Sequence, residues 1–296
     1  VDMVEVPLKQ LGVEVTTQNG YLPIQVKGPL KGGDCYVDGS VSSQFLTGLL
    51  MALPLATKDS TLFVTDLKSK PYIDMTLALL ADFGIRITHD DYQKFSIQGN
   101  QKYKAQSYQI EGDWSGAAFL LVAGAIAGQV TVTNLSAYST QADKAILQAL
   151  QMAGAYLSIE ANQVTVTHKP LSAFVFDATH CPDLFPPLVA LAAHCKGTSV
   201  ITGAKRLLHK ESNRALSLSQ EFGKMGIKIE VYGDQMQITG GEIQSADVHS
   251  HNDHRIAMAC ATATLFGSAT VTIDAAEAIN KSYPTFFDDL ATISSK

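Results

Sequence analysis

The chain has few charged residues and no excess of positive charge. Asp, Glu, Lys and Arg make up 17% of its 296 residues, and the formal net charge is −6. A protein that binds nucleic acid generally presents a basic surface to the phosphate backbone. The acidic balance therefore argues against a nucleic-acid partner.

Closely spaced cysteines and long apolar runs are also missing. The four cysteines are Cys35, Cys181, Cys195 and Cys260, and no two of them form a Cys-x-x-Cys pair. This scatter predicts neither a zinc ribbon nor a disulfide framework and suits reduced thiols in the cytoplasm. Apolar runs such as residues 117–127 are shorter than the ~20 residues that a membrane span needs. With no basic-then-apolar leader at the start, we expect a cytoplasmic protein without a membrane partner.

A unit of about 70 residues is repeated along the chain. Four apolar helices are predicted, each preceded by a polar residue and followed by a strand rich in Thr and Val, with starts at Ser42, Ser115, Asp183 and Asn252. The spacings are 73, 68 and 69 residues, and a constant period indicates one supersecondary unit copied several times. A second, amphipathic helix is predicted after these strands, at residues 74–83, 143–152 and 212–225, and a Gly follows each of these three helices where a helix end favours it. The predicted unit is therefore β-α-β-α-β-β, and the fold class is α/β (α+β).

The repeats predict two lobes. The polar stretch 98–108 is the expected hinge, with residues 1–108 as the N-terminal lobe of about one and a half units and residues 109–296 as a C-terminal lobe of three units. The first helix of each unit is apolar all round, which predicts burial on all sides. Because the chain opens like the second half of a unit, we expect the N-terminal lobe to be incomplete, with roughly 130 residues of a six-unit parent missing.

Positive charge is concentrated in residues 205–214. This segment contains Lys205, Arg206, Lys210 and Arg214 around a single acid, Glu211. A solvated helix face with a Glu211–Arg214 pair is one interpretation. The other is a site that holds an anion and moves a proton beside it.

Other polar residues stand where helices are expected to begin. Ser42, Ser43 and Gln44 lie at such a start, where free N–H groups attract phosphate and carboxylate, although an ordinary serine cap is the simpler interpretation. Ser69 and Lys281 occupy the turns that correspond to residues 205–214 in other units. One anionic site accounts for all of these residues together.

Three histidines, His249, His251 and His254, fall within six residues and suggest a metal site. Only His254 is expected on the helix, so the three rings share no regular face and we predict no metal site. For His254 and Arg255 an anion contact at the helix start fits better. Asp183 is either a helix cap or a base at the same level.

Together these motifs resemble the 5-enolpyruvylshikimate-3-phosphate (EPSP) synthase family of enolpyruvyl transferases. The motifs are Asp38-Gly-Ser-Val-Ser-Ser-Gln-Phe, Ser69-Lys-Pro-Tyr-Ile-Asp, Pro182-Asp, Lys210-Glu-Ser-Asn-Arg, Asn252-Asp-His-Arg and Lys281-Ser-Tyr-Pro. The resemblance implies two lobes of β-α-β-α-β-β units around buried parallel helices. It implies transfer of the enolpyruvyl group of phosphoenolpyruvate to the 5-hydroxyl of shikimate 3-phosphate, without a cofactor and by a monomer when complete.

The resemblance also implies a role for each matching residue. Shikimate 3-phosphate would contact Ser42, Ser43, Gln44, Ser69, Tyr72, Asp183 and Lys210. Phosphoenolpyruvate would contact Gln44, Arg214, His254, Arg255 and Lys281. The catalytic residues would be Asp183, which takes a proton from the attacking hydroxyl, Glu211, which gives one to the methylene carbon, and Lys210.

Some features depart from the family. Arg206 stands where some members carry Asn, and Asn213 where Asp is usual. The family's N-terminal loop, with its catalytic lysine, is not in this sequence, so we expect no turnover by the 296 residues alone. The alternatives are a non-catalytic phosphometabolite-binding protein, the sister transferase that acts on UDP-N-acetylglucosamine, and an RNA-end-processing relative.

Overall fold

The computed structural model describes residues 2–40, 42–208 and 210–294. Val41 and His209, which belong to two of the motifs above, lie outside the described residues. The chain forms two compact units, Val1–Gln109 and Ile110–Lys296, and each is described here by itself.

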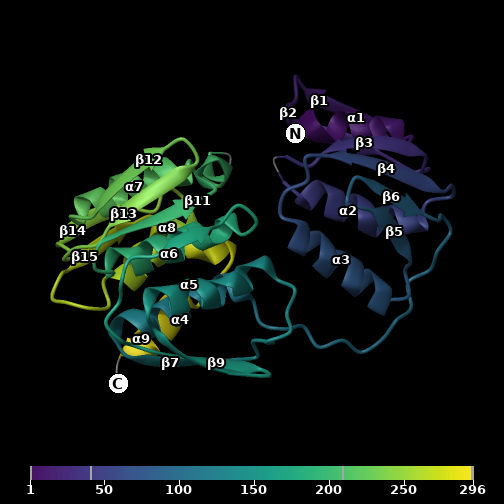
Figure 1. Ribbon diagram of the computed structural model, residues 1–296. Coiled ribbons are helices and arrows are strands. Elements are labelled where there is room, and N and C mark those ends of the chain that lie inside the picture. Colours follow the sequence, from purple (N-terminus) through teal and green to yellow (C-terminus); the bar gives the residue numbers. More distant parts are fainter. Residues whose placement is uncertain (1, 41, 209, 295–296) are drawn as a thin grey trace. The chain divides into compact units, whose positions relative to one another are not determined.

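The N-terminal unit is a four-stranded sheet with two helices, preceded by a helix and a hairpin (Figure 1). Its elements are α1 (Asp2–Gln10), β1 (Glu14–Gln18), β2 (Tyr21–Lys27), β3 (Asp34–Asp38), α2 (Gln44–Ala52), β4 (Ser60–Thr65), α3 (Lys70–Asp82), β5 (Ile87–Asp90) and β6 (Lys94–Ile97). The strand order is β3-β4-β6-β5, in which β3 and β4 are parallel and the other pairs are antiparallel.

The C-terminal unit contains three sheets around a group of helices (Figure 1). Its α-helices are α4 (Trp114–Ala127), α5 (Ile146–Ala153), α6 (Phe185–Ala193), α7 (Arg214–Lys224), α8 (His254–Ala263) and α9 (Phe286–Ser294). Its strands are β7 (Gln129–Thr133), β8 (Tyr156–Glu160), β9 (Gln163–Thr167), β10 (Val175–Asp177), β11 (Thr198–Thr202), β12 (Lys228–Tyr232), β13 (Gln235–Thr239), β14 (Ala246–His249) and β15 (Val271–Asp274). The sheets have the orders β7-β9-β8, β10-β11-β13-β12 and β14-β15.

The same arrangement recurs in both units. The sheets β3-β4-β6-β5 and β10-β11-β13-β12 have the same strand order and the same parallel first pair. Helices α2, α4, α6 and α8 begin at residues 44, 114, 185 and 254, so the intervals are 70, 71 and 69 residues. A backbone hydrogen bond also recurs beside each of these helices, from Gly39 N to Thr65 O, Gly112 N to Asn134 O, Ala178 N to Thr202 O, and Ser250 N to Asp274 O. The repeat read from the sequence is therefore a repeat of backbone geometry.

Burial differs between the two units. Almost every residue of α4, α6 and α8 is buried, and these three helices pack against one another in one apolar core. Helix α2 belongs to a separate core and buries only Leu46, Leu49 and Leu50, whereas Met51 on its other face is 40% exposed. The expectation that this first helix is buried all round is therefore wrong, because α2 shares its core with the sheet and α3 on one face and is exposed on the other.

Some helix boundaries also differ from those expected. Helix α3 begins at Lys70, four residues before the expected Asp74, with Pro71 in its first turn where a missing N–H costs little. Helix α8 begins at His254, and the residue that caps it is Asp253 rather than Asn252. Among the described residues, no helix is both long enough and apolar enough to cross a membrane.

Candidate active site

In the C-terminal unit, the predicted site residues lie at the ends of paired parallel strands. Asp183 follows β10 and lies in a 3-10 helix that leads into α6, and Arg214 follows β11 as the first residue of α7. His254 follows β14 as the first residue of α8. Strand β10 runs parallel to β11, and β14 runs parallel to β15. Within each sheet, the loops that follow these paired strands therefore begin at the same end of the sheet. Free N–H groups at the starts of these helices favour negative charge there.

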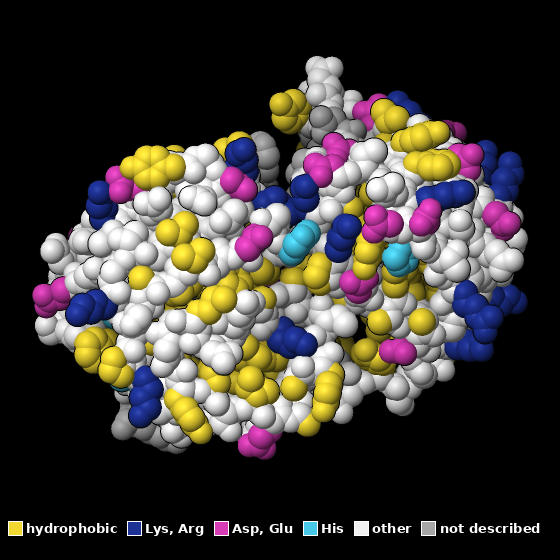
Figure 2. Space-filling view, in the orientation of Figure 1, with side chains coloured by type: hydrophobic (Ala, Val, Ile, Leu, Met, Phe, Trp, Pro, Cys, Tyr) yellow, Lys and Arg dark blue, Asp and Glu magenta, His cyan; other side chains and the backbone are white. Residues whose placement is uncertain are grey.

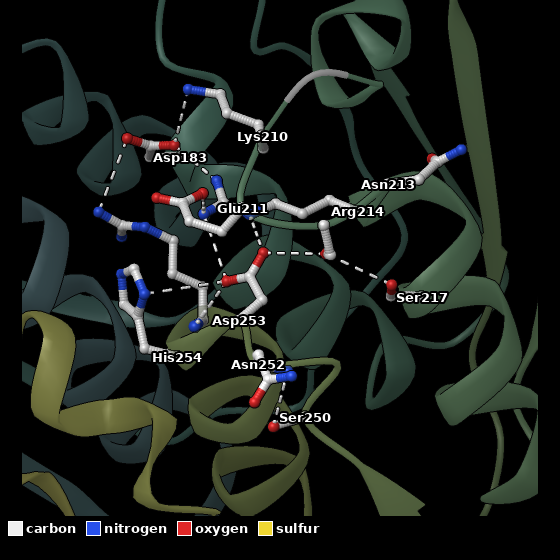
Figure 3. A network of polar contacts seen from close by, with 12 residues as sticks. Asp183, Lys210, Glu211, Asn213, Arg214, Ser217, Ser250, Asn252, Asp253 and His254 are labelled. Carbon is white, nitrogen blue, oxygen red and sulfur yellow. Dashed lines mark hydrogen bonds and ion pairs between the residues drawn. The ribbon is translucent and has the colours of Figure 1, made fainter. Parts of the chain in front are cut away.

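The guanidinium of Arg214 is the centre of this cluster (Figure 3). Its side chain is fully buried, and it donates from Nε to Asp253 Oδ2 (2.8 Å) and from Nη1 to Asp183 Oδ1 (2.7 Å). Its Nη2 donates to Glu211 and, at 3.3 Å, to Asp253 Oδ1. One buried cation thus holds three carboxylates, two of which, Asp183 and Glu211, keep part of their surface exposed.

Further cations surround Asp183. Lys210 Nζ lies 3.1 Å from Asp183 Oδ1, and Arg255 Nη2 lies 3.6 Å from Asp183 Oδ2. The ammonium of Lys281 donates to the backbone carbonyl of Asn252, just before α8. The structure therefore brings together all the residues predicted for this part of the site, and the pair between Glu211 and Arg214 is real but belongs to a larger network.

The charges in the cluster set the protonation of its acids. Burial would raise the pKa of Asp183, but Arg255, Lys210 and Arg214 outweigh it and hold the pKa well below its ordinary value. Burial also opposes the ionised form of Asp253, whereas the charge and hydrogen bonds of Arg214 lower its pKa overall. Both carboxylates are therefore ionised at neutral pH, and the same cations make each of them a weaker base.

Two side chains in the cluster, Arg255 and His254, have nitrogen atoms without hydrogen-bond partners. The side chain of Arg255 is 12% exposed, and its Nε is buried without a hydrogen-bond partner. Neither ring nitrogen of His254 has a hydrogen-bond partner, and burial, followed by the charge of Arg255, lowers the pKa of this ring. A buried donor without a partner is costly, so these atoms favour binding of a ligand that accepts hydrogen bonds.

In the N-terminal unit, the predicted residues lie at the starts of α2 and α3. The hydroxyl of Ser42 accepts from Gln44 N at 3.2 Å, and Ser43 precedes α2 but makes no side-chain cap hydrogen bond. Ser69, which is buried, precedes α3 with a φ of 54°, and Tyr72 lies half-buried in the first turn. Because β3 and β4 are paired in parallel, the loops that carry these serines are neighbours, and Lys68 N donates to Gly39 O at 3.1 Å.

Two departures from the family pattern have structural roles. Asn213 caps α7 by accepting a hydrogen bond from Leu216 N at 3.3 Å, a role that Asp fills equally well. Arg206 Nη1 donates to the carbonyl of Thr179 at 3.1 Å and so joins the loops after β10 and β11.

Sequence reasoning missed Asp253 as a site residue. It is fully buried, caps α8 by accepting from Arg255 N (3.0 Å), and also accepts from Ser212 Oγ (3.0 Å) and Arg214. An Asp directly before an apolar helix is a recognised cap signal, but the pairing with Arg214, 39 residues away, required the fold. Within the described residues, no three His, Cys, Asp or Glu side chains are arranged to hold a metal ion.

Comparison with known proteins shows the family of this chain. The family model described as EPSP synthase (3-phosphoshikimate 1-carboxyvinyltransferase) matches residues 1–290. The chain belongs to the EPSP synthase family. Proteins named 3-phosphoshikimate 1-carboxyvinyltransferase from Methanosarcina acetivorans and Methanosarcina mazei are 42% and 40% identical to it over 299 residues. These matches cover 98% of this chain and 69% of each relative.

A solved EPSP synthase has the same fold. The structure of EPSP synthase from Acinetobacter baumannii matches with a TM-score of 0.80 and 27% sequence identity. The match covers 97% of this chain and 69% of that one. The α/β fold of repeated units implied by the motifs is therefore confirmed.

Proposed function

We propose that this member of the EPSP synthase family binds phosphoenolpyruvate and shikimate 3-phosphate for the enolpyruvyl transfer for which its relatives are named. The observation that carries the proposal is the cluster around Arg214, where four cations and the acids Asp183 and Glu211 meet at the starts of buried helices. Two anionic substrates need several cations, and proton transfer needs an acid or base beside them.

Arg255, His254 and Lys281 form the proposed phosphoenolpyruvate contacts, together with Arg214 and Gln44. Arg255 supports this most directly, because its buried Nε has no partner. Arg214 already uses four of its five N–H groups on three carboxylates, so it offers the substrate one N–H of Nη1 and more only by releasing a carboxylate. Glu211, whose side chain is 40% exposed, is the one most easily displaced, whereas Asp253 is fully buried.

The proton transfers follow from the same arrangement. A carbon–oxygen bond forms between the 5-hydroxyl oxygen and C2 of phosphoenolpyruvate while C3 gains a proton. C3 then loses a proton and the C2–O bond to phosphate breaks. Asp183 is ionised and is the proposed acceptor of the hydroxyl proton; it becomes a stronger base when substrate anions draw Arg255, Lys210 and Arg214 away from it. Glu211, once an anion replaces it on Arg214, is free to carry a proton to and from C3.

Shikimate 3-phosphate is assigned to Ser42, Ser43, Gln44, Ser69 and Tyr72, with Lys210 and Asp183 on its hydroxyls. The support in the N-terminal unit is the pair of adjacent loops at the starts of α2 and α3. Hydroxyl and backbone N–H groups at helix starts are common phosphate ligands. Lys210 is a catalytic residue in this proposal because it touches the reacting hydroxyl as well as Asp183.

We propose small molecules as the only partners, and a monomer in the cytoplasm. In the view of Figure 2, most Lys and Arg side chains lie in separate small groups with Asp and Glu side chains near them, and the net charge of −6 does not favour a nucleic-acid partner. All four cysteines are free and buried, which suits a reducing compartment.

Calorimetric titration with shikimate 3-phosphate tests the proposal. We expect Lys210→Ala to weaken binding by about tenfold or more, since a charge-assisted hydrogen bond is worth about 1.5–3 kcal/mol. Lys205→Ala is the matched control, because Lys205 lies in the same cationic segment but its side chain is exposed. Equal loss in both variants would show that general charge, and not this site, attracts the ligand.

An assay of released phosphate with both substrates separates transfer from binding. The absence of turnover by the 296 residues alone, expected from the sequence, stays a prediction. Binding of shikimate 3-phosphate without turnover agrees with that prediction. A chain that bound neither substrate would contradict the proposed function.

A further inference from the structure

A second buried carboxylate lies on α7, two helical turns after Arg214. Glu221 is 2% exposed and accepts three hydrogen bonds. Its Oε1 accepts from His251 Nε2 (2.7 Å), and its Oε2 accepts from His249 N (2.9 Å) and Lys224 Nζ (2.6 Å). Two of its three donors belong to residues 249–253, which run from the last residue of β14 to the residue before α8.

That segment, residues 249–253, has an unusual backbone. His251 and Asn252 both have a φ of 55°, in the left-handed region that most side chains avoid. Local hydrogen bonds hold the turn, from Asn252 N to Ser250 Oγ (3.1 Å), from Asp253 N to Ser250 O (2.9 Å), and from His251 N to His249 Nδ1 (2.7 Å). A conformation of this kind persists only where its surroundings fix it.

The segment leads directly to the anion site. Its last residue, Asp253, caps α8 and accepts from Arg214 Nε, and the next residues are His254 and Arg255 (Figure 3). Helix α7 therefore holds both ends of the segment: Arg214 binds Asp253 at one end, and Glu221 binds His249 and His251 at the other.

We propose that Glu221 is a positioning residue for the active site, which holds residues 249–253 in place and so fixes Asp253 against Arg214. The inference that Glu221 matters for substrate binding rests on the function proposed above, whereas the inference that it affects Arg214 does not. Glu221 touches neither Arg214 nor the proposed substrate contacts, so it acts only through the segment that it binds.

The chemistry requires a carboxylate at this position. Burial would raise the pKa of Glu221, but the hydrogen bonds from Lys224, His251 and His249 N lower it, so the group is ionised and only accepts. A glutamine has one acceptor oxygen and would direct its NH2 group at a donor. Glu221→Gln therefore keeps the size of the side chain and loses part of the contact with the segment.

The test is the nitrogen-15 NMR signal of the Arg214 Nε–H in the full chain. This proton is buried and bonded to Asp253, so it exchanges slowly with water. In Glu221→Gln we expect its exchange to become about tenfold faster, because the segment opens locally more often. Fluorescence of Trp114, the single tryptophan, shows whether the C-terminal unit remains folded.

Lys224→Met is the matched control, because it removes the one donor to Glu221 that lies outside the segment. This variant should leave the exchange of Arg214 unchanged. If Glu221→Gln does not fold, His251→Phe replaces it, since it removes only the ring donor to Glu221. We then expect the exchange of the Arg214 Nε–H to accelerate less than it would if every contact between Glu221 and residues 249–253 were lost.

The outcomes separate the two proposals. Unchanged exchange of Arg214 in a folded Glu221→Gln protein, or an equal change in Lys224→Met, overturns the role of Glu221. Faster exchange together with weaker binding of phosphoenolpyruvate supports both proposals. The last outcome is faster exchange while phosphoenolpyruvate binds as tightly as it does to the unaltered chain. That result supports the role of Glu221 and counts against the proposed phosphoenolpyruvate site.

Discussion

Helix α2 in the N-terminal unit and helices α6 and α8 in the C-terminal unit occupy the same place in the repeat but have different surroundings. Helix α2 buries one face, whereas α6 and α8 are buried on all sides. The residues before these helices also differ in how many structural contacts they make. The hydroxyl of Ser43 makes no cap bond, while Asp253 both caps α8 and binds Arg214.

This difference shows how one backbone arrangement serves two kinds of ligand contact. In the C-terminal unit, Asp253 is buried with Arg214 beside it, and the attraction between the two charges offsets the cost of removing both from water. In the N-terminal unit, the corresponding positions carry hydroxyls, which need no counter-charge. The charged residues of the C-terminal site therefore also stabilise the fold, whereas the hydroxyl of Ser43 does not cap its helix.

The largest expected effect comes from removing the buried cation. Arg214→Met leaves Asp253 buried without its partner, and we expect unfolding of the C-terminal unit to become easier by about 3–5 kcal/mol. Urea unfolding followed by Trp114 fluorescence measures it. Lys9→Met is the comparison in the N-terminal unit. Lys9 forms a surface pair with the partly exposed Glu5 on α1, so urea unfolding followed by circular dichroism should show no measurable change. A small loss in Arg214→Met would show that the network does not stabilise the unit.

Truncations in the helices come next. Val189 and Leu191 lie on opposite sides of α6 and are both fully buried, so each replacement by Ala should cost about 2 kcal/mol or more. On α2, Leu49→Ala should cost a similar amount, whereas Met51→Ala, on the exposed face, should cost less than about 1 kcal/mol. Urea unfolding followed by circular dichroism measures both pairs. Equal losses at Leu49 and Met51 would mean that α2 is covered on both sides.

The smallest effect concerns the caps. Asp113 accepts from Ser115 N (2.9 Å) and Gly116 N (3.0 Å) at the start of α4, so Asp113→Ala should cost about 1 kcal/mol. Ser43→Ala should leave stability nearly unchanged, because its hydroxyl caps nothing, but should weaken binding of shikimate 3-phosphate. Thermal unfolding and calorimetry on the same samples separate the two effects. A destabilised Ser43→Ala protein that still bound the ligand would make Ser43 a structural residue.

Much of the fold could be predicted from the sequence because the signals are local and repeated. The period of the apolar helices and the glycines after the amphipathic helices were enough to predict the β-α-β-α-β-β unit. The exposed face of α2 could not be predicted, since an apolar helix does not reveal which neighbours cover it. Boundaries near Lys70 and His254 were displaced by a few residues, as Pro71 and Asp253 start helices in ways that the apolar pattern does not show.

The candidate site could be predicted only in part. Local motifs pointed to Asp183, Lys210, Glu211 and Arg255, because each stands beside a helix start or within the cationic segment. Asp253 and Glu221 were missed as parts of one network, because their partners lie 28 to 39 residues away and are brought together by the packing of α7 on α8.

The central claim is that the charge cluster of the C-terminal unit is a preformed anion site with donors to spare. Calorimetric titration of phosphoenolpyruvate into the chain and into Arg255→Met tests it most directly, since Arg255 has a buried Nε without a partner. We predict that the variant binds at least about tenfold more weakly, as expected for loss of a charge-assisted hydrogen bond, while Lys205→Met binds as the unaltered chain does. The same affinity in Arg255→Met and the unaltered chain would contradict the claim.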